Sequence, residues 1–274
     1  MPTYNRPEGL RRTLACLCAQ TYRELDILVS DNASPDPTVA AVVADMAARD
    51  PRIRYVRQPE SLGAAGNFRF VLAQSDAEYF MWAADDDEWQ PGFVEACMGA
   101  LLSTPGAVSA MTGIETLYRT SGRRVPVAMP SLSVLQDAAT NVRAFFARMT
   151  PGMFYGVHRR DAIVFFLDDD MFDYYDCYFV LRLIAAGGVV LVDGPLYTAG
   201  VDAAKYQIKP MRRSWGSGLR YRPFHRAVRT VIAAVEVRYF PRRILECRLA
   251  LLVARLFVAQ ECAALVHRIR RFRG

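Results

Sequence analysis

The sequence lacks the residue patterns of several common classes of protein. Its six cysteines are scattered along the chain, at Cys16, Cys18, Cys97, Cys177, Cys247 and Cys262. They form neither a disulfide framework nor a zinc site, so we expect reduced, mostly buried thiols in a cytoplasmic protein. The three histidines, at 158, 225 and 267, stand far apart. The sequence therefore offers no Ser/His/Asp or Cys/His arrangement for covalent catalysis.

Hydrophobic runs long enough to cross a membrane are also missing. The most apolar stretch, 244–266, is interrupted by Glu246, Arg248, Arg255 and Glu261. A helix with that many charges spans a bilayer poorly. The first residues, Met-Pro-Thr-Tyr-Asn-Arg, contain no basic and then apolar run, which predicts no signal peptide.

What the chain does have is size and an uneven charge. Its 274 residues are enough for one large α/β domain with an appendage. The formal charge is +6, and the segment 205–273 is rich in arginine. We expect this basic tail to contact an anionic partner. Nucleic acid, an anionic membrane surface and the pyrophosphate of a sugar nucleotide all fit that description, so charge alone does not choose among them.

Helical and extended patterns alternate along the chain. The expected helices are 8–20, 39–48, 64–74, 91–103 and 175–186, and the expected strands are 26–30, 53–56, 79–83, 107–114, 154–157 and 189–192. This alternation predicts an α/β fold with a doubly wound, mostly parallel sheet. We interpret the irregular stretch 120–133 as a flexible acceptor loop. Polar motifs at Asp31 and Asp85 follow expected strands, so they should face one crevice at the carboxyl ends of the sheet.

The sharpest local motif is Asp85-Asp86-Asp87, directly after the expected strand 79–83. Carboxylate oxygens there suit a hard divalent cation such as Mg²⁺ or Mn²⁺, together with phosphate oxygens and water. An acidic triplet also occurs as a solvated loop or at the start of a helix. Taken alone, the motif leaves both interpretations open.

Four motifs together resemble a known family. In order, they are Thr3-Tyr4-Asn5-Arg6, Val29 to Ser34, Gly63 to Asn67, and Trp82 to Asp87 followed by Pro91. In this order and spacing they resemble the nucleotide-binding half of family-2 glycosyltransferases, which have the Rossmann-like GT-A fold. The resemblance covers about residues 2–200. It implies an inverting transfer of a sugar from a nucleotide-diphosphate donor to a hydroxyl of a glycan or glycolipid, in surface polysaccharide synthesis.

The resemblance also implies roles in nucleotide binding. Pro2, Thr3 and Tyr4 would line the nucleobase and ribose pocket, and Asp31 would accept a hydrogen bond from the base. The remaining nucleotide-binding candidates are Asn5, Arg6, Asn67, Arg69 and Asp85. The assignments of Asp31 and Arg69 have simpler alternatives. An aspartate such as Asp31 often forms a turn, and an arginine on a helix, such as Arg69, often faces solvent.

The metal assignment follows from the same resemblance. Asp86 is implied as the principal ligand of a divalent metal, Mn²⁺ or Mg²⁺, with Asp85 and Asp87 beside it. Relatives often carry an acid at the position of Ala84, so the assignment among the three aspartates is open by one position.

A segment in the second half supplies the candidate catalytic base. Tyr174 to Leu183, followed by Gly187-Gly188, resembles the family segment in which an acid opens a helix below the acceptor. That acid would be Asp176, which would take the proton of the acceptor hydroxyl. An acid in the first turn is also favoured by the helix dipole alone. Four nearby acids compete for the role but fit the spacing less well, namely Asp168, Asp169, Asp170 and Asp173.

We divide the chain into a catalytic domain at 1–204 and a basic, amphipathic helical tail at 205–274. Four basic residues at the start of the tail are candidates for closing over the pyrophosphate, namely Lys205, Lys209, Arg212 and Arg213. Further along, five apolar residues share one helical face, namely Phe224, Val228, Val231, Ile232 and Val235. The helices either pack against the domain or a second subunit, forming a homodimer, or lie on the inner face of the cell membrane.

These inferences define the expected partners and the competing functions. We expect a nucleotide-sugar donor, with a UDP-sugar favoured, a glycan or lipid-linked glycan acceptor, and no nucleic acid. One alternative is a nucleotidyltransferase or sugar-nucleotide pyrophosphorylase, which normally carries a Gly-rich phosphate loop where this chain has Thr3 to Pro7. The other is a non-enzymatic basic scaffold that binds membrane or nucleic acid.

One feature departs from the family pattern. Relatives have an apolar strand directly before the Pro-x-Tyr-Asn motif, in the middle of the sheet, where this sequence has only Met1. A misassigned or truncated start would account for the difference. A gap at a central strand would cost many ladder hydrogen bonds.

Overall fold

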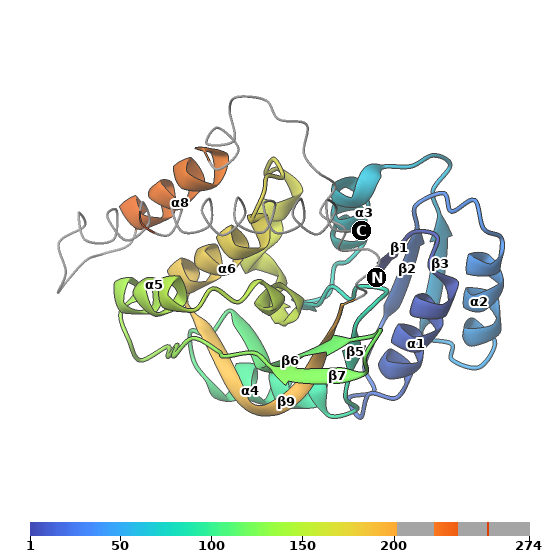
Figure 1. Cartoon of the computed structure of the whole chain (residues 1–274), viewed down its shortest axis with the longest axis horizontal. Coiled ribbons are helices and arrows are strands. Elements are labelled where there is room, and N and C mark those ends of the chain that lie inside the picture. The colour runs from blue at the N-terminus through green and yellow to red at the C-terminus, as the bar shows by residue number, and fades with distance from the viewer. Residues whose placement is uncertain (202–221, 235–250, 252–274) are drawn as a thin grey trace, which may run out of the picture.

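The computed structural model describes residues 1–201, 222–234 and 251. Helices surround two sheets in this part of the chain (Figure 1). The first half contains β1 (Pro2–Thr3), α1 (Pro7–Cys18), β2 (Ile27–Asp31), α2 (Thr38–Ala47), β3 (Ile53–Arg57), α3 (Gly63–Ala73) and β4 (Tyr79–Phe80). The strands β1, β2 and β3 pair in that order, all parallel. Helix α3 lies on one side of them and α1 and α2 on the other, so the predicted doubly wound arrangement is confirmed here (Figure 1).

Local sequence explains α1, the helix that later supports the site. Pro7 occupies its first turn, where a missing N–H costs nothing. Leu10, Leu14 and Leu17 recur at helical spacing and are buried. The helix thus presents one apolar face to the core.

The second half forms a mixed sheet. Its elements are β5 (Glu88–Trp89), α4 (Phe93–Ser103), β6 (Ser109–Tyr118), β7 (Arg123–Pro126), α5 (Ala138–Ala147), η1 (Pro151–Tyr155), β8 (Val157–Arg159), η2 (Arg160–Ala162), η3 (Val164–Leu167), α6 (Tyr175–Ala186), β9 (Val189–Val201) and α8 (Arg222–Ala234). The strand order is β4-β8-β6-β9-β5, with β7 beside β6. β6 and β9 run parallel, whereas β4–β8, β6–β8, β5–β9 and β6–β7 are antiparallel. The α/β class is confirmed, but parallel pairing prevails only in the first sheet.

Two elements differ from the sequence-based expectation. The stretch 120–133 is not wholly irregular, because a tight turn with Gly122 at φ +68° folds β7 back onto β6 as a hairpin. The strand expected to end at Val192 continues to Val201. Its register against β6 shifts near Gly113, which pairs with Pro195, and Gly194 just before it has φ +96°, so a bulge carries the strand onward.

β1 is only two residues long, and a cavity lies beside it. The Met1 amino group donates to the Leu28 carbonyl at 2.7 Å. A cavity of about 390 Å³ is bordered by residues of β2 and β4, and by Val71 and Met98. At this place the two sheets are not joined by strand pairing in the described part of the chain.

Aromatic side chains form the centre of the core below the acidic loop. Trp82 is fully buried, and its ring centroid lies 4.7 Å from those of Phe154 and Phe166 and 5.6 Å from that of Phe179. Its indole N–H donates to the Phe68 carbonyl at 3.1 Å. Burying so large a ring with its N–H paired fixes the chain just before Asp85.

The described part of the predicted tail, α8, packs against the rest of the described chain. Phe224, Val228, Val231 and Ile232 are all buried, and Tyr174 and Phe224 have ring centroids 5.9 Å apart. The predicted apolar face is therefore confirmed for α8, which contacts α6. The domain boundary near 205, the four basic residues at 205–213, Val235 and the stretch 244–266 lie outside the described residues. No helix in the described ranges is long and apolar enough to cross a membrane.

The cysteines within the described ranges agree with the expected reduced state. Cys16, Cys18, Cys97 and Cys177 are free, and the last two are buried. Burial raises the pKa of the Cys97 thiol to about 12. Such thiols act as small apolar groups.

His158 is a buried titratable group of the same core. Its Nδ1 lies 2.8 Å from Ser109 Oγ and its Nε2 lies 3.0 Å from the Phe154 carbonyl. Burial lowers its pKa from 6.5 to about 4, although the carbonyl of Phe154 opposes the change. The folded chain therefore keeps this imidazole neutral at pH values where the unfolded chain protonates it.

We expect His158 to destabilise the fold in mild acid. Its stabilising contribution is complete above pH 6.5 and is lost as the pH falls toward 4, because only the unfolded state takes up the proton in that range. Between pH 7 and pH 5 the free energy of unfolding should fall by about 2 kcal/mol more in the parent than in His158→Gln. Urea unfolding of both proteins at the two pH values measures this difference. If the free energy of unfolding falls equally in the parent and in His158→Gln, groups other than His158 cause the acid sensitivity.

Candidate active site

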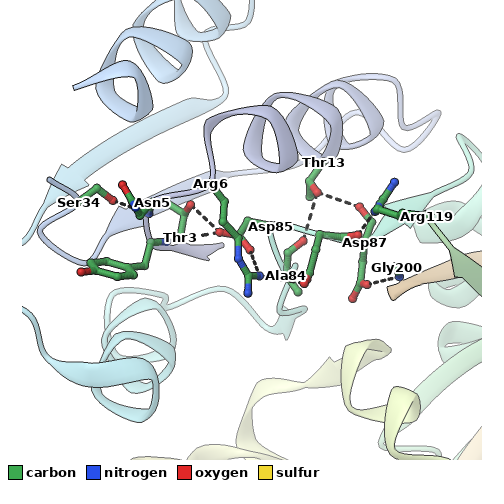
Figure 2. Close-up of polar contacts among 12 residues, drawn as sticks. Thr3, Asn5, Arg6, Thr13, Ser34, Ala84, Asp85, Asp87, Arg119 and Gly200 are labelled. Carbon is green, nitrogen blue, oxygen red and sulfur yellow. Dashed lines mark hydrogen bonds and ion pairs between the residues drawn. The ribbon is translucent and has the colours of Figure 1, made fainter. Parts of the chain in front are cut away.

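The segment from Thr3 to Arg6 joins the two polar loops that follow β2 and β4. Thr3 Oγ1 donates to Asp85 Oδ2 at 2.8 Å, and the Asn5 N–H donates to Ser34 Oγ at 2.9 Å. Asn5 has φ +54°, which turns the chain sharply between them. Tyr4, between these two anchors, is half exposed. The loops that carry Asp31 and Asp85 therefore lie beside the same segment of the chain, as expected (Figure 2).

Asp85 is the buried member of the acidic loop. Its side chain is 7% exposed and accepts hydrogen bonds from Thr3 Oγ1, the Tyr4 N–H and Arg6 Nη1. Burial raises the pKa of Asp85, while Arg6 and Thr3 favour its ionised form. This carboxylate ties the end of β1 to the acidic loop.

Asp86 is the accessible member. Its side chain is 33% exposed, and Oδ2 lies 2.9 Å from Arg6 Nη1, the same nitrogen that lies 2.8 Å from Asp85 Oδ1. Burial opposes the charge on Arg6, but the two carboxylates together raise its pKa. One cationic nitrogen therefore already occupies a position between two carboxylates, as a bound cation would.

This arrangement fits a divalent metal that also binds the donor. Among the described residues, no group of three or more His, Cys, Asp or Glu side chains gathers around one point. Mg²⁺-type sites that handle nucleotides use one or two carboxylates and complete their shell with phosphate oxygens and water. Asp85 and Asp86 meet that requirement, as the Arg6 nitrogen between them illustrates.

Asp87 faces a different direction from its neighbours. It is buried, and its two oxygens accept from Tyr197 Oη at 2.6 Å and from the Gly200 N–H at 2.8 Å. Burial raises the pKa of Asp87 to about 7, against the effect of both donors. The carboxylate thus connects the acidic loop to β9 (Figure 2).

Backbone contacts fix the loop from both sides, through residues that sequence reasoning missed. Thr13 Oγ1 on α1 donates to the carbonyls of Ala84 and Asp87 at 3.2 and 2.8 Å. Arg119 Nη2 donates to the Asp86 carbonyl. A side chain at Gly9 would overlap the Asp85 carbonyl oxygen, and one at Gly200 the Asp86 carbonyl oxygen. The isolated Gly9 within a helical pattern was the one available signal, since such glycines often mark close packing.

The predicted base-recognition residue, Asp31, pairs with Thr3 across the sheet, but its side chain is engaged by neighbouring groups. It is buried, and its oxygens accept from the Ser34 N–H and from Tyr55 Oη, at 2.9 and 2.8 Å. Arg57 Nε lies 3.7 Å away. Pro2 and Thr3 pair with Ser30 and Asp31 across the sheet, so these residues form one continuous edge.

Two further nucleotide-binding candidates make internal contacts. Asn67 is buried and exchanges hydrogen bonds with Ser30, from Nδ2 to the carbonyl at 2.9 Å and from Ser30 Oγ to Oδ1 at 2.5 Å. Arg69 donates to the carbonyls of Phe166 and Asp169, at the end of η3. Arg69 thereby connects the donor-side helix α3 with the segment that precedes α6.

Asp176 lies in the first turn of α6, as expected. Its Oδ1 accepts from the Cys177 N–H at 2.8 Å. Burial raises the pKa of Asp176, whereas that N–H favours the ionised form. Of the competing acids, Asp169 accepts from Tyr175 Oη at 2.9 Å, which occupies one of its oxygens.

Three non-glycine residues with positive φ occur in the described ranges, and all lie in the motifs singled out above. They are Asn5 at +54°, Ala33 at +60° and Tyr174 at +65°. This conformation is unfavourable for residues with a side chain and concentrates at functional sites.

Comparison with known proteins identifies a family that matches the first half of the chain. The model for "Glycosyl transferase family 2" matches residues 1–147. One relative is the GalNAc(5)-diNAcBac-PP-undecaprenol beta-1,3-glucosyltransferase of Campylobacter jejuni, 33% identical over 99 residues, which are 36% of this chain and 32% of that protein. The alignments with the first curated relatives cover only about a third of their length or less.

Solved structures establish the fold. S. aureus TarS in complex with UDP-GlcNAc aligns with a TM-score of 0.63 at 15% identity, over 94% of this chain and 71% of that one. The mannosyltransferase PcManGT of Pyrobaculum calidifontis, in complex with GDP-Man and Mn²⁺, aligns with a TM-score of 0.54 at 16% identity, over 99% and 81%. The fold is the GT-A fold. With the family model matching more than half of its residues, this chain belongs to glycosyl transferase family 2.

Proposed function

We propose that the protein is a metal-dependent, inverting glycosyltransferase that moves a sugar from a nucleotide-diphosphate donor, with a UDP-sugar favoured, to a hydroxyl of a glycan or lipid-linked glycan. The observation that carries the proposal is the pair Asp85 and Asp86 around one cationic nitrogen, beside the half-exposed Tyr4. The UDP-GlcNAc complex of TarS and the undecaprenol-linked substrate in the name of the Campylobacter relative support the donor and acceptor classes.

On the donor side, the proposal assigns distinct tasks to the residues of the crevice. Tyr4 offers a ring face to the nucleobase, and Asp31 accepts from the base once Tyr55 yields its hydrogen bond. Pro2, Thr3 and Asn5 shape the pocket wall, and Asn67 holds β2 in place through Ser30. Arg69 acts through the loop before α6 instead of touching the nucleotide.

At the acidic loop, Asp86 would hold Mn²⁺ or Mg²⁺ with the help of Asp85. When bound, such an ion acts as a Lewis acid that stabilises negative charge on the leaving diphosphate. Asp87 has a positioning task, because both of its oxygens are used by β9. The Mn²⁺ in the PcManGT complex supports a metal at this kind of site.

On the acceptor side, Asp176 would take the proton of the attacking hydroxyl. A carboxylate whose pKa is raised by burial is a stronger base than an exposed one, which suits removal of a hydroxyl proton. Inversion follows when the hydroxyl attacks the anomeric carbon from the face opposite the diphosphate. Synthesis of a surface polysaccharide would place the enzyme at the inner face of the cell membrane. The exposed Arg226 on α8 is compatible with this location.

Binding of nucleoside diphosphates tests the proposal directly. UDP with Mn²⁺ should raise the melting temperature by several degrees at 100-fold excess over Kd, roughly 2.7 kcal/mol of stabilisation, because only the native state binds it. GDP, CDP and dTDP show which base is preferred, UTP shows whether a triphosphate is preferred, and UMP with Mn²⁺ and UDP with EDTA are the controls. A preference for nucleoside triphosphates would favour a pyrophosphorylase, and no metal-dependent shift with any diphosphate would favour a non-enzymatic scaffold.

A further inference from the structure

Arg6 occupies the point between the carboxylates that we propose as metal ligands. Its Nη1 lies 2.8 Å from Asp85 Oδ1 and 2.9 Å from Asp86 Oδ2 (Figure 2). A divalent cation bound to the same oxygens would stand within a few ångströms of the guanidinium, where like charges repel strongly even at a protein surface. The guanidinium and the metal therefore compete for Asp86.

The two contacts of Arg6 differ in how firmly they are held. Asp85 is nearly buried and has two other donors, Thr3 Oγ1 and the Tyr4 N–H. Asp86 and Arg6 are each about one third exposed, and in the described part of the chain Arg6 is the side chain that donates to the Asp86 carboxylate. Exposed ion pairs are weak, so the contact with Asp86 is the one that yields first.

The backbone around Arg6 is fixed by local contacts, whereas its side chain is partly exposed and is held by its two carboxylate partners. Asn5 holds the left-handed turn, the Arg6 carbonyl accepts from the Leu10 N–H at 2.9 Å, and Pro7 starts α1. A change of side-chain rotamer is thus enough to move the guanidinium. The planar N–H groups of the guanidinium match a phosphate better than a single carboxylate oxygen. When the sugar nucleotide binds, its diphosphate can therefore accept hydrogen bonds from Arg6.

We propose that Arg6 is an internal competitor of the metal, which holds Asp86 in the donor-free enzyme and passes to the diphosphate when the metal and donor bind. This inference rests on the proposed function. Its consequence is that the metal binds weakly alone and tightly with nucleotide, so that metal and donor enter together. Arg6 is then a specificity-determining residue for a diphosphate with its metal.

Binding of Mn²⁺ alone to the full chain tests this, with free Mn²⁺ measured by electron paramagnetic resonance. Arg6→Met and Arg6→Gln both remove the charge, and each should bind Mn²⁺ without nucleotide at least about tenfold more tightly than the parent. With UDP present, the same variants should bind Mn²⁺ and UDP about tenfold more weakly than the parent does, because the diphosphate loses its guanidinium. Arg11→Met removes the same charge from the exposed face of α1, where Arg11 pairs with Asp45, and should change either affinity less than about twofold.

Three outcomes overturn the inference. If both Arg6 variants bind Mn²⁺ without nucleotide no more tightly than Arg11→Met does, Arg6 does not compete with the metal. Tighter binding both with and without UDP shows that Arg6 does not pass to the diphosphate. A parent that binds no Mn²⁺ even with UDP or GDP refutes the proposed metal site itself, and the inference with it. The melting temperature of each variant verifies that it is folded. Because two different substitutions remove the charge of Arg6, the test still stands if one of these variants does not fold.

Discussion

Asp86→Ala is expected to abolish the Mn²⁺-dependent part of nucleoside diphosphate binding. Asp86 is the more exposed carboxylate of the pair. Without it, only Asp85 would remain to bind the metal, and Asp85 is buried and already accepts hydrogen bonds from Thr3 and Arg6. Loss of even an outer-shell partner of a metal costs about 10- to 100-fold in affinity, so losing a ligand should cost on the order of 10²-fold or more. Calorimetric titration with UDP, at saturating Mn²⁺ and again with EDTA, separates the metal-dependent part from the remainder.

Asp87→Asn is the matched control for this measurement. An asparagine can still accept from the Gly200 N–H and pair with the Tyr197 hydroxyl, so the loop should stay anchored to β9. Metal-dependent binding should remain within a few-fold of the parent. If Asp87→Asn loses as much as Asp86→Ala, then Asp87 is a ligand after all, and the apparent anchor on β9 rearranges when metal binds. If Asp86→Ala binds UDP and Mn²⁺ as the parent does, the metal assignment is wrong.

The second large effect is expected at Asp176. Asp176→Asn keeps the size of the side chain and its hydrogen bond from the Cys177 N–H, but it cannot take a proton. The transfer rate should therefore fall by roughly 10² to 10⁴, the usual contribution of a positioned general base. Affinity for UDP and Mn²⁺ should stay near the parental value, because the donor site is built from other elements.

The measurement is the single-turnover transfer rate with a saturating donor, alongside the nucleotide affinity of the same preparation. Asp169→Asn is an informative comparison, since its carboxylate already accepts from Tyr175. A transfer rate within a few-fold of the parent in Asp176→Asn would reduce Asp176 to a helix-opening acid and make Asp173 and Asp170 the next residues to test. A collapse of nucleotide affinity would instead show that α6 is coupled to the donor site, for example through the Arg69 contacts with the preceding segment.

Much of the site was accessible from sequence because its motifs are local. The apolar run before Asp85 predicts a strand, and a doubly wound sheet brings strand ends to one edge, so the loops at Asp31 and Asp85 could be placed in one crevice without coordinates. The helix opened by Asp176 follows equally from spacing. In each case the position of a side chain depends mainly on residues within a few positions of it in the chain.

The pairing partners of those motifs could not be predicted in this way. Asp31 and Asn67 form internal hydrogen bonds with Tyr55 and Ser30, and Arg69 reaches carbonyls about 100 residues further along the chain. An exposed arginine and a bridging arginine have the same sequence pattern. Only the packing of α3 against η3 distinguishes them.

By itself, the sequence determined the α/β class, most helices and strands, and the place of the acidic loop after a strand, because hydrophobic periodicity and strand-end motifs are short-range properties. The tertiary structure decided which partners each aspartate has. β9 continues past Asp193-Gly194 only because a bulge opposite Gly113 keeps it paired with β6, and this extension brings Tyr197 and Gly200 to Asp87. With Asp87 held there and Asp85 held by Thr3, Asp86 is left facing solvent and Arg6. Three identical residues in a row thus differ in exposure and partners because strands more than 80 residues apart in sequence meet on either side of them.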